Sequence, residues 1–180
     1  MKLLAFAGSS STQSINKKLV TYAAGLFDAE TETEILDLND YELPLFSVDR
    51  EKLIGQPPVA RQFLDKIEWA DVLFISVAEH NAGLTVAFKN IYDWASRQKK
   101  VVFDNKPVLL LSTSPGRYGG KNALDAAVIS LRNYGGDIRA TFSLPSFTHN
   151  FDVEANAISN KELDDALKDI IRNFDYEQKA

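Results

Sequence analysis

The chain has 180 residues, of which 45% are hydrophobic and 25% charged, so its length and composition predict one folded domain over residues 1–180. It has no cysteine and only two histidines, which excludes disulfides, thiolate nucleophiles and cysteine zinc sites and argues against a histidine-rich metal site. The net charge of −5, from 20 basic and 25 acidic side chains, argues against nucleic-acid and membrane partners.

Targeting and membrane-spanning patterns are not expected either. The apolar run near the start of the chain is five residues long, shorter than the roughly 7–15 residues of a signal-peptide core. No apolar stretch approaches the ~18 residues of a membrane span. The expected location is therefore the cytoplasm.

Short apolar runs alternate with amphipathic segments along the chain. The runs predict strands at residues 2–7, 34–38, 71–77, 106–113 and 138–142. The amphipathic segments predict helices at residues 16–27, from 57–58 onward, and at 85–96, 121–134 and 161–174, with an irregular stretch at 39–56. This alternation predicts an α/β fold with a doubly wound parallel sheet. Ligands of such sheets bind beyond the carboxyl ends of the strands, which directs attention to the loops after the first, third and fourth strands.

The loop after the first strand has the composition of a phosphate cradle. Residues 8–16 read Gly-Ser-Ser-Ser-Thr-Gln-Ser-Ile-Asn and lead into a helix N-terminus, where free amides and the helix dipole favour an anion. The triphosphate pattern G-x-x-x-x-G-K-[ST] and the dinucleotide pattern G-x-G-x-x-G are both absent, so a monophosphate fits best. The alternative is that Ser14 caps the helix and the other serines are solvated.

The loops after the third and fourth strands have features that suit a flat ring. Residues 78–83 supply backbone polar groups and the planar side chain of His80. Residues 114–120 contain three glycines, which allow a ligand to approach closely, and Arg117, which suits phosphate or carboxylate. The alternatives are a tight turn before a helix capped by Thr85, a surface histidine and a solvated arginine. One phosphate loop together with two ring loops predicts FMN.

At these residues the chain resembles the NADPH-dependent FMN reductase family, the flavodoxin-like group that includes chromate, quinone and azo-dye reductases. The resemblance covers about residues 2–142 and is carried by four blocks in order. These blocks are G-S-x-x-x-x-S-x-N at 8–16, Leu-Pro-Leu-Phe at 43–46 with Asp49, E-x-N at 79–81 followed by K-N-x-x-D-W at 89–94, and S-x-S-P-G-x-x-G-G at 112–120. It implies a flavodoxin-like sheet in the order 2-1-3-4-5, with helices on both faces, and a homodimer or homotetramer.

The resemblance also implies an activity. NADPH or NADH would pass a hydride to bound FMN, and a quinone, azo compound, metal oxyanion or free flavin would then take the electrons in the same slot, a ping-pong order. The chemistry is assigned to FMN, so no catalytic side chain and no metal are expected. A non-enzymatic flavodoxin-type electron carrier and a flavin-binding module are the alternatives.

The residues expected at the cofactor come from all three loops. They are Ser9, Ser14, Ile15 and Asn16 at the phosphate, Glu79, His80, Asn81 and Ala82 along the ring, Ser114 and Gly116 at its other edge, and Arg117 at the NAD(P)H phosphate or the pocket rim.

Three positions depart from the family pattern. Ser11 stands in place of an arginine, Ala78 in place of a proline and His80 in place of a tyrosine. Lys17 and Lys18 are the candidates to replace the lost positive charge near the phosphate. The departures bear on flavin affinity, on NADPH preference and on the wall beside the ring.

Overall fold

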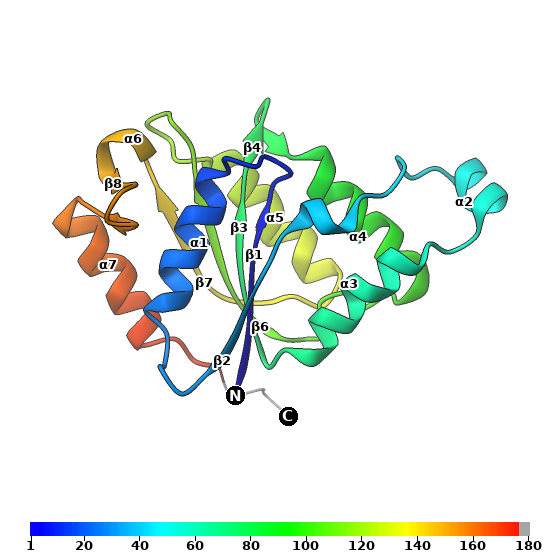
Figure 1. Ribbon diagram of the computed structural model, residues 1–180, viewed down its shortest axis with the longest axis horizontal. Coiled ribbons are helices and arrows are strands. Elements are labelled where there is room, and N and C mark those ends of the chain that lie inside the picture. Colours follow the sequence, from blue (N-terminus) through cyan, green and yellow to red (C-terminus); the bar gives the residue numbers. More distant parts are fainter. Residues whose placement is uncertain (177–180) are drawn as a thin grey trace.

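The computed structural model describes residues 1–176, and its centre is a parallel sheet of five strands (Figure 1). The strand order is β2-β1-β3-β6-β7, which is the predicted order 2-1-3-4-5, so the expected fold class is confirmed. The strands are β1 (Lys2–Gly8), β2 (Glu32–Leu36), β3 (Val72–Val77), β6 (Pro107–Thr113) and β7 (Asp137–Leu144). The predicted domain over residues 1–180 includes residues 177–180, which lie outside the described residues.

Helices cover both faces of this sheet (Figure 1). Helices α1 (Ile15–Gly25) and α7 (Lys161–Arg172) lie on one face, and α3 (Pro58–Trp69), α4 (Val86–Gln98) and α5 (Lys121–Asn133) lie on the other. Because alternate residues of a strand point to opposite faces, each face has its own apolar cluster. In β1, Leu3 and Ala5 belong to the cluster under α1 and α7, whereas Leu4 and Phe6 belong to the other.

Several short elements differ from the prediction. The strand expected at 34–38 ends at Leu36, and Leu38–Tyr41 form a 3₁₀ helix (η1) because the Asp37 carboxylate accepts from the Asn39 amide and starts a new turn. The stretch at 39–56, which was expected to be irregular, also contains α2 (Val48–Ile54). Ser47 caps this helix, and none of its residues is buried. A helix without a buried face has no apolar periodicity to predict it.

Two further differences are hairpins. The loop expected at 78–84 forms β4 (Glu79–His80) and β5 (Gly83–Leu84), paired antiparallel. Beyond β7, α6 (Phe147–Asn150) leads into the second hairpin, β8 (Phe151–Asp152) and β9 (Ala157–Ile158). Strands of two residues are too short for an alternating pattern, so periodicity does not reveal them.

The K-N-x-x-D-W block of α4 holds the segment that follows η1. The Asn90 side chain accepts from the Phe46 amide at 2.8 Å and donates to the Leu43 carbonyl at 3.1 Å. The Trp94 indole donates to the Pro44 carbonyl at 2.7 Å. Two sequence blocks that are about 45 residues apart therefore form one structural unit beside the phosphate loop.

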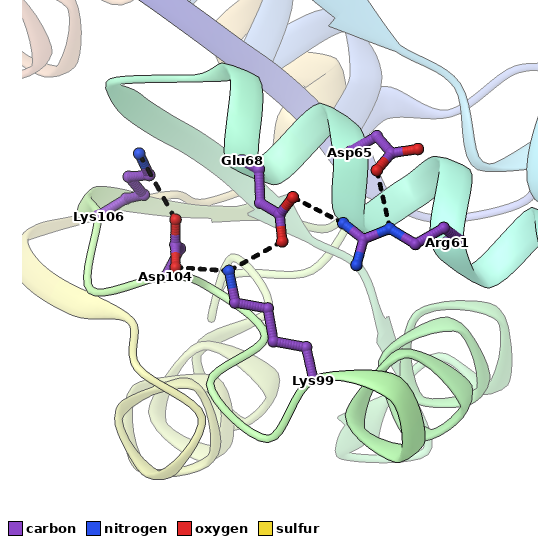
Figure 2. Close-up of polar contacts among 6 residues, drawn as sticks. All are labelled: Arg61, Asp65, Glu68, Lys99, Asp104 and Lys106. Carbon is purple, nitrogen blue, oxygen red and sulfur yellow. Dashed lines mark hydrogen bonds and ion pairs between the residues drawn. The ribbon is translucent and has the colours of Figure 1, made fainter.

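A network of charged side chains lies at the amino ends of β3 and β6 (Figure 2). Glu68 of α3 pairs with Arg61 at 2.7 Å and with Lys99 at 2.9 Å, and Lys99 also pairs with Asp104 at 2.6 Å. Hydrogen bonds from Arg61 and Lys99 hold the pKa of Glu68 below its ordinary value. The network ties α3 and the end of α4 to the loop before β6, at the edge of the sheet opposite the predicted site.

Candidate functional site

A cleft of about 310 Å³ lies beyond the carboxyl ends of the strands. It is bounded by the loops that follow β1, β3 and β6, which are the three loops that the sequence singled out. The loops meet because the strand order reverses between β1 and β3. The connection that follows β1 therefore runs over one face of the sheet and the connection that follows β3 over the other, which leaves an opening between them. The lining residues are Ser9, Ser11, Gln13, Ser14, Ile15 and Asn16 from the first loop, Ala78, Glu79 and His80 from the second, and Thr113, Ser114 and Pro115 from the third.

The first loop presents hydrogen-bond donors to this cleft. Ser14 is the N-cap of α1, since its Oγ accepts from the Lys17 amide at 3.1 Å, which confirms the capping part of the alternative; Ser9 is 8% exposed, so the other serines are not all solvated. Capping uses only an acceptor position of Ser14, so its hydroxyl hydrogen is still able to donate. Within residues 1–176, the backbone amides of Ile15 and Asn16 donate no hydrogen bond to a protein acceptor. The loop therefore offers two amides, at the positive end of α1, to an anion.

The side chain of Asn16 is committed to the fold. It is 2% exposed, and its Oδ1 accepts from the Ser76 hydroxyl at 2.8 Å and from the Thr113 amide at 3.0 Å. Its Nδ2 donates to the Thr113 carbonyl at 3.1 Å. Asn16 thus fixes the start of α1 to the ends of β3 and β6, and its side chain has partners within the fold.

Glu79 likewise has a partner that the sequence did not indicate. Its carboxylate accepts from the Ala123 amide at 3.1 Å and from the Asn122 side chain at 3.4 Å. The N-cap of α5 is Gly120, which has no side chain to cap the helix, so Glu79 supplies the negative charge that a helix N-terminus favours. Its carboxylate therefore joins the second loop to α5 while Glu79 lines the cleft.

The tip of the β4–β5 hairpin lies outside the residues that line the cleft. Asn81 and Ala82 have φ angles of 51° and 62°, so both central residues of this two-residue turn are left-handed. That pattern belongs to a type I′ turn, in which asparagine is common and alanine is strained. The turn places His80, which is exposed and lines the cleft, at the rim.

The third loop is held by hydrogen bonds on both sides. The Ser112 hydroxyl donates to the Gly119 carbonyl at 2.7 Å, and the Phe147 amide donates to the Ser114 carbonyl at 3.0 Å. Gly116 and Arg117 do not line the cleft. The Arg117 guanidinium instead stacks on the ring of Tyr118, 4.7 Å from its centroid, and both side chains are exposed.

Neither of the two lysines near the first loop lines this cleft. Lys17 is paired with Asp37. Burial tends to raise the pKa of Asp37, but hydrogen bonds from Lys17 and Asn39 outweigh it and hold that pKa below its ordinary value. Lys17 and Lys18 border an adjoining hollow that shares Gln13 and Ser14 with the cleft, so the expectation that one of them replaces the lost charge stays a prediction. The cleft lining includes no lysine or arginine.

Five lining residues were not among the expected contacts: Ser11, Gln13, Ala78, Thr113 and Pro115. All five lie within or directly beside the predicted loops, so position in those loops was the available signal. Thr113 is the last residue of β6 and lines the cleft at the point where Asn16 binds it.

Comparison with known proteins places the chain among NAD(P)H-dependent flavin and quinone reductases by sequence similarity. The sequence pattern of the NADPH-dependent FMN reductase family matches residues 1–149. The chain is 33% identical over 123 residues to the NAD(P)H-dependent FMN reductase PA1204 of Pseudomonas aeruginosa, which covers 68% of this chain and 65% of that protein. It is 31% identical over 169 residues to the NADPH:quinone oxidoreductase of Arabidopsis thaliana, with 88% and 82% covered.

The fold is also similar to that of a solved flavoenzyme. The flavoenzyme NAD(P)H:(acceptor) oxidoreductase FerB of Paracoccus denitrificans superposes with a TM-score of 0.76 at 22% identity, over 96% of this chain and 94% of that one. Among residues 1–176, no helix combines the length and apolar character needed to cross a membrane.

Proposed function

The chain belongs to the NADPH-dependent FMN reductase family, and from this premise we propose that it is an FMN-dependent NAD(P)H oxidoreductase. The observation that carries the proposal is the cleft where the three loops meet, with the unpaired amides of Ile15 and Asn16 at one end. The P. aeruginosa relative extends beyond the aligned region, since the match spans 65% of its length.

The donors around the cleft fit FMN. The hydroxyls of Ser9 and Ser14 and the amides of Ile15 and Asn16 would hold a phosphate without a lysine or arginine. The backbone at Glu79 and His80 would lie along one edge of the ring. Ser114 would lie along the other edge.

Asn81, Ala82, Gly116 and Arg117 stay predictions for the ring edge and the cosubstrate, because they are not among the residues that line the cleft. When bound, FMN supplies hydride acceptance from NADPH or NADH and electron delivery to a second substrate, in a ping-pong order. A quinone, azo compound, metal oxyanion or free flavin is the proposed class of acceptor. The cytoplasmic location expected from the sequence stays a prediction that cell fractionation tests.

The direct test is reconstitution with FMN followed by steady-state oxidation of NADH and NADPH with a panel of acceptors. We expect yellow protein that oxidises at least one nicotinamide in the presence of a quinone. Protein that stays colourless with added FMN would contradict the cofactor assignment. Bound FMN without nicotinamide oxidation would instead favour the electron carrier or the flavin-binding module.

Replacing Ser14 by alanine should weaken FMN binding by about tenfold, because a hydrogen bond to a charged phosphate is lost. Flavin fluorescence quenching on titration measures the dissociation constant. Ser47→Ala is the matched control, since Ser47 caps α2 through the same bond to a backbone amide, at 3.0 Å, and does not line the cleft. Equal FMN affinity of the two variants would show that Ser14 acts only as a helix cap.

The proposed homodimer or homotetramer has a candidate surface on α2, which extends away from the sheet (Figure 1). Val48, Leu53 and Ile54 are 56%, 78% and 47% exposed there, an apolar group that the chain itself leaves uncovered. Leu53→Asp should shift the protein toward monomer in sedimentation velocity. Ile129→Asp, at an apolar position that is 69% exposed on α5, should leave the dimer intact, and the reverse result would contradict this surface.

A further inference from the structure

A second hollow adjoins the cleft on the other side of the phosphate loop. This groove, of about 430 Å³, runs between the segment that follows β2 and the first half of α4. Ser10 lines the groove, whereas its neighbours Ser9 and Ser11 line the cleft, so the two hollows are separated by a single stretch of backbone. A ligand that crosses this loop reaches both.

The walls of the groove suit a flat base with a sugar attached. Leu38, Leu43, Val86 and Ile91 provide apolar surface, and the segment is fixed in place by the hydrogen bonds of Asn90. Its volume is within the range of small-molecule sites, ~300–1,000 Å³.

The groove has a carboxylate and no cation among its lining residues. Glu42 is the charged residue of that lining, and it is exposed. Asp40, in η1, adds a second acidic residue to the same segment. The nearby Lys17 is already paired with Asp37, and Arg97 of α4 is paired with Glu51 at 2.9 Å. Nothing in this lining would neutralise an added phosphate.

We propose that the groove receives the adenosine half of the nicotinamide cosubstrate and that Glu42 selects NADH over NADPH. The inference rests on the proposed function, because the nicotinamide must reach the cleft across Ser10. The adenosine ribose of NADH has a free 2′-hydroxyl, which donates to a carboxylate, whereas NADPH has a 2′-phosphate, which a carboxylate repels. The Glu42 carboxylate would therefore bind the 2′-hydroxyl of NADH and repel the 2′-phosphate of NADPH.

The kinetic test compares kcat/KM for NADH and NADPH in FMN-loaded protein. The unmodified chain should favour NADH, and Glu42→Arg should move the ratio toward NADPH by about tenfold. Glu42→Gln should give an intermediate ratio, because it removes the charge and keeps a polar group. Glu30→Arg makes the same charge change at an exposed position between α1 and β2, outside the groove, and should leave the ratio unchanged.

A binding test separates the groove from catalysis. ADP-ribose and 2′-phospho-ADP-ribose lack nicotinamide, and calorimetric titration should show tighter binding of ADP-ribose, with the preference reversed in Glu42→Arg. A preference for NADPH, or a ratio that Glu30→Arg changes as much as Glu42→Arg, would overturn the inference and leave the proposed function intact. A Glu42→Arg variant whose ratio of kcat/KM for NADH to kcat/KM for NADPH is unchanged would also overturn the inference, whatever its oligomeric state. If the protein oxidises neither NADH nor NADPH, that result would contradict the proposed function itself, regardless of whether ADP-ribose binds.

Discussion

Replacing Asn16 by leucine should lower the free energy of unfolding of the FMN-free protein by about 3 to 5 kcal/mol, because each buried polar group left without a partner costs roughly 1–3 kcal/mol. The substitution strands the Ser76 hydroxyl and both backbone groups of Thr113. Urea unfolding, followed by circular dichroism, measures the loss.

The same experiment distinguishes two roles for Asn16. A side chain that only held phosphate would affect FMN affinity and leave the FMN-free protein as stable as before. Asn133→Leu is the matched control, since Asn133 is exposed near the end of α5, and its effect should be within about 0.5 kcal/mol. Equal stability of the two variants would contradict the bridging role.

Replacing Gly119 by alanine should destabilise the protein by about 2 to 4 kcal/mol, from the left-handed backbone and from overpacking together. Gly119 has φ of +59°, and an added Cβ would lie 2.3 Å from the Ser143 Oγ and 2.9 Å from the Leu144 carbonyl oxygen. The carbonyl belongs to the backbone of β7, so this contact is relieved only if the third loop moves. Thermal unfolding measures the stability, and FMN titration reports whether the loop still forms one side of the cleft.

Two comparisons make the Gly119 result specific. Gly25→Ala places a methyl group where nothing lies within 4 Å, in the last turn of α1, and should stabilise the protein by about 0.5–1 kcal/mol. Adding Ser143→Ala to Gly119→Ala removes the shorter contact and should recover part of the loss. A neutral Gly119→Ala would show that the loop adjusts without cost.

The order of the elements and the position of the site were predictable because their signals are local. The three central strands β1, β3 and β6 are almost continuous apolar runs, and the long helices have an apolar stripe at helical spacing. Right-handed connections in a parallel sheet then bring the loops after β1, β3 and β6 to one edge. Ser14 as a helix cap was readable for the same reason, since its partner is three residues away.

The roles of Asn16 and Glu79 were not predictable, because their partners are distant in the sequence. Asn16 binds groups 60 and 97 residues away, and Glu79 binds an amide 44 residues away. Both residues were expected to contact the cofactor through their place in a motif. The structure gives each side chain a partner within the fold.

The sequence by itself therefore determined the fold class, the family resemblance and the edge of the sheet where the candidate site lies, since periodicity, capping and loop composition act over a few residues. Only the tertiary structure decided which groups around the cleft are free. It paired Lys17 with Asp37 and stacked Arg117 on Tyr118, so two of the three cations that the sequence offered to a phosphate have partners within the fold. It also opened the groove beside Ser10, because that groove is formed by segments that follow different strands and meet only when the sheet is assembled.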